Sequence, residues 1–222
     1  MIFKAVNIRK SYGKKQVLKD VSFDLSSGQC LGILGGNGSG KSTLLSVLAG
    51  VMPADGGLVL ADDTDLLENR KIGSRLVGYV PQGTPLMEEL TAWDNLRLWY
   101  DKDVLQKELE SGILSVLGIA DFLKVPVKKL SGGKKKRLSI GCAMAGRPPI
   151  LLLDEPTAAL DLACKQDITA YLTLYKQAGG ILILTTHDAS ELSLCDQCCI
   201  LKNGVLENFH FTGDVDALVR NL

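Results

Sequence analysis

The sequence has no long apolar segment, and its first residues do not predict a secretory signal. A membrane-spanning helix needs roughly 18 consecutive apolar residues. The strongest apolar stretches, Ile150–Leu153 and Ile181–Leu184, are only as long as a strand. The segment 1–15 mixes charged with apolar residues and lacks the uninterrupted apolar region of a signal peptide. We therefore expect a chain that does not itself enter the membrane.

An excess of either charge is also missing. Lysine and arginine total 25 and aspartate and glutamate total 25, so the formal net charge is zero. This balance provides no general attraction to nucleic acid or to an acidic membrane surface. No nucleic-acid partner is expected.

Cysteines paired at metal-ligand spacing are a third absence. The six cysteines are scattered, apart from the group Cys195, Cys198 and Cys199. A Cys-x-x-Cys pair can be a redox motif or half of a zinc site, but no second Cys or His pair provides the remaining ligands. We expect reduced, partly buried thiols, as in the cytosol.

The chain does contain a series of short apolar segments bounded by turn residues. Strands are predicted at Lys4–Ile8, Val17–Leu25, Cys30–Leu34, Leu58–Leu60, Val77–Val80, Ile150–Leu153 and Ile181–Leu184, with a hairpin at 199–206. From Thr91, which can cap a helix together with Asp94, to about Arg147 the chain is mostly helical. The pattern predicts an α/β core with an inserted helical lobe.

A glycine-rich loop joins the strand Cys30–Leu34 to a helix. The loop Gly35-Gly36-Asn37-Gly38-Ser39-Gly40-Lys41-Ser42 fits G-x-x-x-x-G-K-[ST], and the helix has apolar positions up to Val51, before Pro53. Backbone N–H groups of such a loop converge on phosphate at a helix N-terminus. We expect Lys41 to reach the β- and γ-phosphates and Ser42 to bind Mg²⁺. The register of four glycines with Lys and Ser argues against a merely structural turn.

Two acids follow the apolar strand Ile150–Leu153. Asp154 is expected at the carboxyl edge of the sheet, where it would hold a phosphate-bound Mg²⁺. Glu155 would orient or deprotonate the attacking water. Taken alone, the pair Asp154–Glu155 fits an acidic cap on the next turn as well as it fits these metal and water roles.

At Leu130-Ser131-Gly132-Gly133 the sequence resembles the ABC ATPase superfamily, whose signature is LSGGQ. Ser131 precedes Asp154 by 23 residues, a separation similar to that of the family. Further matches follow in the family's order: Tyr12 for the aromatic stacked on adenine, Gln82 for the Q-loop, Asp161 in the D-loop and His187 for the switch histidine.

The resemblance implies a P-loop ATPase core with a mostly parallel central sheet, an N-terminal antiparallel β subdomain and an inserted helical signature subdomain. It implies one domain over 1–222, with the core at about 1–85 and 148–222 and the helical part at about 86–147. The implied catalytic residues are Glu155, His187 and Lys41. Implied nucleotide contacts are Tyr12, Gly35, Gly36, Asn37, Gly38, Ser39, Gly40, Lys41, Ser42, Thr43, Gln82, Ser131, Gly132, Gly133 and Asp161. The implied metal ligands are Ser42, Gln82 and Asp154.

Some positions depart from the family's pattern. Lys134 replaces the signature glutamine, which alters a ribose contact, and Lys135, Lys136 and Arg137 follow it. We interpret this basic run as a solvated helix face rather than a nucleic-acid patch. Gly36 and Ala158 also differ from common family residues, and neither change removes a phosphate, metal or water contact.

The implied function is that of the ATP-hydrolysing subunit of an ABC transporter. ATP would close a head-to-tail dimer with a second copy or a paralogue, each signature covering the γ-phosphate in its partner's glycine-rich loop. Hydrolysis would reopen the dimer and power a separate membrane permease, in the direction of export, at the cytoplasmic face of the membrane. The alternative is a soluble ABC ATPase such as an iron–sulfur cluster assembly ATPase. Intact Lys41, Asp154, Glu155 and His187 argue against a module that switches without hydrolysis.

Overall fold

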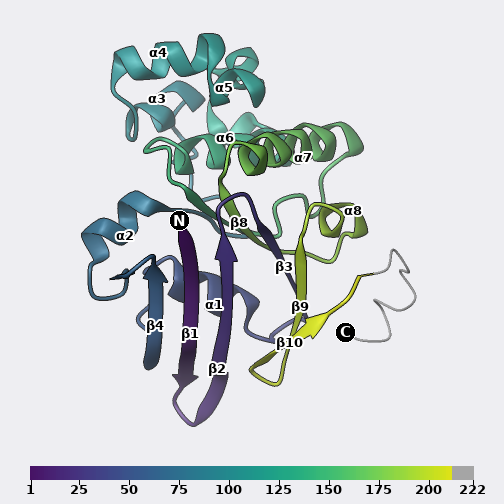
Figure 1. Cartoon of the computed structure of the whole chain (residues 1–222). Helices are drawn as coiled ribbons and strands as arrows, with labels where there is room; N and C mark the ends of the chain where they lie inside the picture. Colours follow the sequence, from purple (N-terminus) through teal and green to yellow (C-terminus); the bar gives the residue numbers. More distant parts are fainter. Residues whose placement is uncertain (212–222) are drawn as a thin grey trace.

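The chain forms both strands and helices in a computed structural model that describes residues 1–211 (Figure 1). The strands are β1 (Ile2–Tyr12), β2 (Lys15–Ser26), β3 (Cys30–Leu34), β4 (Gly56–Ala61), β5 (Thr64–Asp65), β6 (Val77–Val80), β7 (Ile150–Asp154), β8 (Ile181–Thr185), β9 (Gln197–Lys202) and β10 (Val205–Phe209). The helices are α1 (Lys41–Leu48), α2 (Arg70–Leu76), α3 (Ala92–Arg97), α4 (Lys102–Ser111), α5 (Ile113–Val116), η1 (Ile119–Phe122), η2 (Val127–Lys129), α6 (Gly132–Ala143), α7 (Leu162–Gln177) and α8 (Ala189–Leu192).

The larger sheet has the strand order β10-β9-β3-β8-β7-β6. The five strands from β9 to β6 pair in parallel, and only β10 runs antiparallel to its neighbour. Every residue of β3, β7 and β8 is buried. Strands covered on both faces are expected to be continuously apolar, which explains the runs that predicted them.

The smaller sheet is antiparallel, with the order β2-β1-β4-β5. Its strands alternate between buried and exposed residues, as in β1, where Phe3, Ala5 and Ile8 are buried. This alternation buries one face against the core that also holds α1. The two sheets confirm the predicted fold class, an α/β core with an antiparallel N-terminal sheet.

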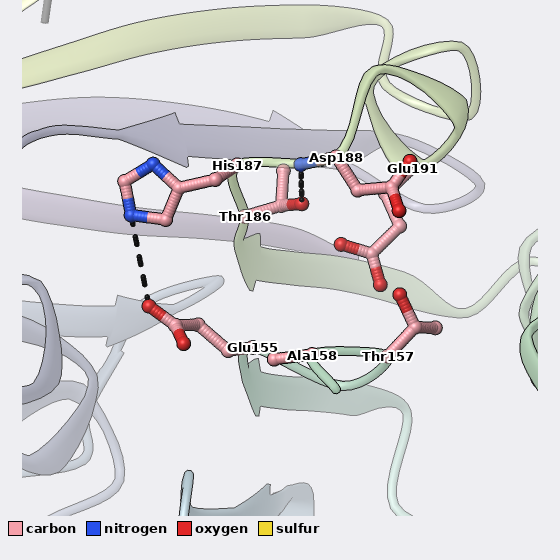
Figure 2. A pocket seen from close by; sticks show the side chains of 7 residues that line it. All are labelled: Glu155, Thr157, Ala158, Thr186, His187, Asp188 and Glu191. Atoms are coloured by element: carbon pink, nitrogen blue, oxygen red, sulfur yellow. Dashed lines mark hydrogen bonds and ion pairs between the residues drawn. The ribbon is translucent and has the colours of Figure 1, made fainter. Parts of the chain in front are cut away.

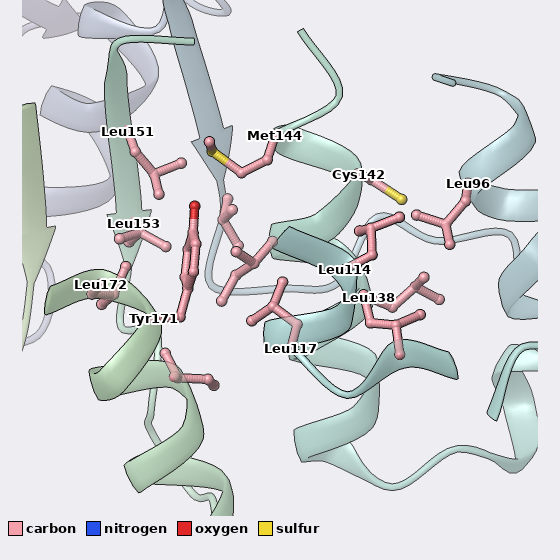
Figure 3. Packing of buried hydrophobic residues seen from close by; sticks show 14 of the residues in the cluster. Leu96, Leu114, Leu117, Leu138, Cys142, Met144, Leu151, Leu153, Tyr171 and Leu172 are labelled. Atoms are coloured by element: carbon pink, nitrogen blue, oxygen red, sulfur yellow. The ribbon is translucent and has the colours of Figure 1, made fainter. Parts of the chain in front are cut away.

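Helices α3 to α6 lie between β6 and β7 in the chain and form the helical part above the sheets in Figure 1. Thr91 and Asp94 make the predicted capping box at the start of α3. Figure 3 shows one apolar cluster joining these helices to β7 and α7. Leu96 and Leu138 contribute from the helical part, and Leu151 and Tyr171 from the core. Among residues 1–211, no helix is long and apolar enough to span a bilayer.

The helix after the glycine-rich loop is shorter than predicted. It ends at Leu48, and Val51 is 70% exposed. Gly50 adopts φ +67°, while the N–H of Gly50 donates to Val47 O and the N–H of Val51 donates to Ser46 O. These contacts are those of a helix terminated by a left-handed glycine. Gly50, rather than Pro53, therefore ends the helix.

Candidate functional site

Four neighbouring strands deliver the predicted motifs to one edge of the larger sheet. The order β3-β8-β7-β6 places the glycine-rich loop, the segment before His187, the pair Asp154–Glu155 and Gln82 next to one another. The carboxyl ends of parallel strands are the usual location of a ligand in an open α/β sheet. Residues separated by more than a hundred positions in the chain thus meet at one place.

The glycine-rich loop at 35–42 forms a cradle in which two glycines leave no room for a side chain. A Cβ on Gly35, whose φ is +151°, would lie 2.5 Å from Leu201 O and 2.7 Å from Ser39 Oγ. Gly40, with φ +108°, would place one 2.8 Å from a methyl group of Val17. Ser39 Oγ is buried without a hydrogen-bond partner among the described residues. An anion accepting hydrogen bonds from this loop fits such a cradle.

Lys41, the first residue of α1, is buried, and its ammonium lies inside the loop. Its Nζ donates to Gly35 O at 2.5 Å and lies 3.3 Å from His187 Nε2. Burial lowers the pKa of Lys41, whereas the charges of Glu155 and Asp154 raise it. The ammonium therefore lies inside the loop and beside His187, where it can meet a phosphate that the loop binds.

Asp154, at the end of β7, is 2% exposed and is held by a residue that the sequence did not single out. Thr185 Oγ1, at the end of β8, donates to Asp154 Oδ1 at 2.6 Å. The same hydroxyl accepts from the N–H of Glu155 at 3.0 Å. Thr185 thus fixes both acids, and only the pairing of β7 with β8 reveals this role.

Glu155 adopts a left-handed backbone conformation with φ +48°, which costs about 1 kcal/mol or more outside glycine. Its Oε2 accepts from Gln82 Nε2 at 2.8 Å, and its Oε1 lies 3.7 Å from His187 Nε2. Figure 2 shows the second contact, with His187 and Glu155 facing one another across a pocket. Burial, followed by the charge of Lys41, lowers the pKa of His187, so its neutral form is favoured at neutral pH. The carboxylate is held between an amide and an imidazole.

A cleft of about 310 Å³ gathers most of the predicted residues. Its lining includes Tyr12, Gln82, Glu155 and every loop residue from Asn37 to Thr43. The Tyr12 hydroxyl donates to Met52 Sδ at 3.0 Å and lies 3.5 Å from Thr43 Oγ1, so its ring lies beside the start of α1. The hollow of Figure 2, about 350 Å³, adjoins this cleft through Glu155.

The signature residues do not line this cleft in the part of the chain that the structure describes. Ser131 caps α6, where its hydroxyl accepts from Lys134 N at 3.4 Å, and Ser131 and Gly132 are exposed. Asp161 likewise caps α7. A Cβ on Gly133 would lie 2.3 Å from Cys164 Sγ, so this glycine packs against α7. The exposed start of α6 is open to a second molecule.

The basic run after the signature is not simply a solvated face. Lys136 is 5% exposed, and its Nζ donates to Pro81 O at 3.1 Å and to Gln82 O at 3.2 Å. Lys135 matches the prediction better, since it pairs with the exposed Glu88. The ammonium of Lys134 lies 5.6 Å from the ring centroid of Phe122. The prediction failed for Lys136 because α6 turns that position toward the sheet.

The cysteines and the second histidine lie outside the cleft. All six cysteines are free, and four of them, Cys30, Cys142, Cys164 and Cys199, are buried. Among residues 1–211, no group of three or more His, Cys, Asp or Glu side chains is placed to hold a metal ion. His210, which matches no motif, is exposed.

The family model described as "ABC transporter" matches residues 18–158, a segment that contains the cradle, the signature and both acids. The chain belongs to the ABC transporter family. The "Linearmycin resistance ATP-binding protein LnrL" of Bacillus subtilis is 33% identical over 208 residues, which cover 91% of this chain and 67% of that protein. The "Nod factor export ATP-binding protein I" of Sinorhizobium fredii is 37% identical over 203 residues, covering 89% and 59%. The "Lipoprotein-releasing system ATP-binding protein LolD" of Porphyromonas gingivalis is 34% identical over 216 residues, covering 93% and 99%.

Solved structures of this family have the same fold. A dimeric ATP-binding cassette in a post-hydrolysis state, bound to ADP and phosphate, matches with a TM-score of 0.80 and 30% identity, covering 93% of this chain and 97% of its own. A nucleotide-free cassette matches with a TM-score of 0.83 at 24% identity, which shows the fold alone. The chain is thus an ATP-hydrolysing subunit of this family, and its relatives favour that function over an iron–sulfur assembly ATPase.

Proposed function

We propose that this ATPase powers a separate membrane permease in the direction of export. The main support for the proposal is a cleft in which the glycine-rich loop, Gln82 and Glu155 meet. The signature residues Ser131 and Gly132 lie exposed outside this cleft. Export is supported by the names of the Nod factor and lipoprotein-releasing relatives. The subunit would lie at the cytoplasmic face of the membrane through its permease. It would form one domain with a core at about 1–85 and 148–222, of which 212–222 lie outside the described residues, and a helical part at about 86–147.

In the proposed mechanism, the cradle residues 35–43 bind the phosphates and Lys41 neutralises charge on the β- and γ-groups. The ring of Tyr12 would stack on the adenine. Glu155, held by Gln82 and His187, orients the attacking water and accepts its proton. His187, favoured in its neutral form, donates a hydrogen bond to the γ-phosphate.

Ser42, Asp154 and Gln82 would hold Mg²⁺, and the donor set fits this ion. Magnesium is usually bound through one or two carboxylates together with substrate phosphates and water, so a cluster of acids is not required. The hydrogen bond from Thr185 orients the single buried carboxylate of Asp154. When bound, the metal would neutralise charge that develops on the phosphate oxygens.

The signature would complete the site of a second subunit. Ser131, Gly132 and Gly133 present a hydroxyl and backbone N–H groups at the N-terminus of a helix of 12 residues, which favours an anion. Because these residues do not line their own chain's cleft, the γ-phosphate they cover belongs to a partner. Asp161, at the start of α7, would lie at the same junction.

The shared site is tested by complementation between two defective chains. In a Glu155→Gln background, which should trap ATP, Lys41→Ala empties one cradle and Ser131→Arg blocks one signature. Neither chain alone should dimerise with ATP, whereas their mixture should, because one intact cradle then meets one intact signature. The parent Glu155→Gln protein is the positive control. A mixture that stays monomeric while the parent dimerises would refute the shared site.

A further inference from the structure

Lys136 connects the helix that carries the signature to the loop that carries Gln82. It lies in the second turn of α6, and its Nζ donates to the carbonyl oxygens of Pro81 and Gln82. The loop at 81–82 follows β6 and belongs to the core side of the cleft, whereas α6 belongs to the helical part. A single side chain therefore spans the joint between the two.

The connection continues from Gln82 to the proposed catalytic acid. The side chain of Gln82 donates to Glu155 Oε2 at 2.8 Å, while its backbone oxygen accepts from Lys136. Three residues thus form an unbroken series of polar contacts from α6 to Glu155. The start of α6 is the surface that would cover a partner's phosphate, so each end of the series lies at a different nucleotide.

Burial of Lys136 needs a reason beyond packing. None of the described carboxylates forms an ion pair with its ammonium, which meets two backbone oxygens instead. Burial lowers its pKa, and the more distant charges of Asp154, Glu155 and Glu191 raise it. A buried charge without an ionic partner is costly, and an apolar side chain of similar length would avoid that cost. Donation to the two carbonyl oxygens is what an apolar side chain of that length could not supply.

We propose that Lys136 is a positioning residue that transmits movement of the signature helix to Glu155 of the same chain. The inference rests on the proposed catalytic role of Glu155 and on the proposed shared site. When the signature closes on the partner's ATP, α6 moves and Lys136 pulls the loop at 81–82 with it. Gln82 then repositions the Glu155 carboxylate in the site of its own chain. Each chain would in this way couple the two ATP sites of a dimer.

The first test compares Lys136→Met with Lys136→Arg in the full chain. Methionine keeps the length and apolar body, and should lower kcat by about 10- to 100-fold, the scale expected for a displaced catalytic group, with KM changed less than about twofold. Arginine can donate to both carbonyl oxygens and should restore most of the rate. Lys135→Met, one position away and paired with an exposed acid, is the matched control and should keep the wild-type kcat.

A second test separates the two ends of the series. Each heterodimer combines one chain that has an intact Glu155 with one Glu155→Gln chain, and two different affinity tags allow its purification. All hydrolysis then comes from the intact chain. The signature of the intact chain still meets the ATP trapped in the Glu155→Gln chain. Lys136→Met on the intact chain should slow single-turnover hydrolysis by about 10-fold or more. The same change on the Glu155→Gln chain should leave the rate within about twofold of the reference dimer.

Equal loss from both positions, loss only from the Glu155→Gln chain, or no loss at all would overturn the proposal. So would a Lys136→Met homodimer whose kcat equals that of the Lys135→Met control. Failure of the proposed function would be seen in a different measurement. A Glu155→Gln homodimer that hydrolyses ATP at the wild-type rate would remove Glu155 from the mechanism, and with it the role of Lys136.

Discussion

Replacing Thr185 with valine removes one hydroxyl and leaves the shape of the side chain. That hydroxyl donates to Asp154 Oδ1 at 2.6 Å and accepts from the N–H of Glu155 at 3.0 Å. The N–H of Glu155 keeps a second acceptor, Thr185 O at 3.2 Å, whereas the buried carboxylate of Asp154 loses a charge-assisted donor. The main loss therefore falls on Asp154.

The magnitude follows from these two contacts. A hydrogen bond to a charged group contributes about 1.5–3 kcal/mol, and an added methyl group recovers about 0.8 kcal/mol when buried. The net loss of unfolding free energy is then about 1–2 kcal/mol, which lowers Tm by about 2–8 °C in a chain of this size. Because Asp154 loses the donor that orients its carboxylate, we also expect kcat for ATP to fall about 10-fold.

Thermal unfolding and steady-state ATPase measurements test this together. Thr185→Ser keeps the oxygen and should retain most of the stability and rate. Thr173→Val on α7, which removes only a bond to Thr169 O of the same helix, should cost at most about 0.5 kcal/mol. If Thr185→Val matches the parent protein in both Tm and kcat, the hydroxyl does not hold the two acids and the reasoning is wrong.

Three further predictions concern Glu155, Met87 and Glu191. Glu155→Gln should lower kcat by about 10²–10⁴ with ATP affinity retained, since only the proton acceptor is lost; a wild-type rate in an ATPase assay would contradict this. Met87 is 55% exposed on a loop whose backbone is held by the buried Asn95. Met87→Asp should therefore keep the ATPase rate of the free subunit but prevent transport and permease binding in a reconstituted complex. Unimpaired transport would place the docking surface elsewhere. Burial raises the pKa of Glu191 above its ordinary 4.5, so its stabilising contribution is complete below that pH and is lost as pH rises through the folded-state pKa. Glu191→Gln should accordingly stabilise the protein at neutral pH and lose that advantage near pH 4, and urea unfolding at both pH values that shows no such difference would exclude the linkage.

The sequence predicted those parts of the fold whose local pattern and tertiary environment agree. Runs such as Ile150–Leu153 are apolar throughout because the strand is covered on both faces, so burial and pattern indicate the same element. The hairpin predicted at 199–206 turns at Asn203-Gly204, where both residues adopt the positive φ that a tight turn requires, so the local sequence and the backbone agree.

Features that depend on contacts between distant segments were missed. Nothing near Thr185 in the chain indicates that its hydroxyl meets Asp154, because that contact exists only once β8 lies beside β7. Lys136 belongs to a run of four basic residues, and only the direction in which α6 faces the sheet separates it from its neighbours. The order of the motifs was readable from the sequence, whereas the hydrogen bonds that connect them required the packed chain.

The position of β3 also determines when the cradle can form during synthesis. Its two neighbours in the sheet are β8 and β9, both from the last part of the chain, although the cradle follows β3 directly. At a translation rate of about 5–20 residues per second, the segment between Leu34 and Gln197 takes roughly 10–30 s to appear. Until β8 is synthesised near the end of that interval, the phosphate-binding loop extends from a strand that has neither of its sheet neighbours. The glycine-rich loop is therefore translated early but is among the last segments to become a binding site. ATP cannot assist the folding of a chain that leaves the ribosome before β8 and β9 have been synthesised.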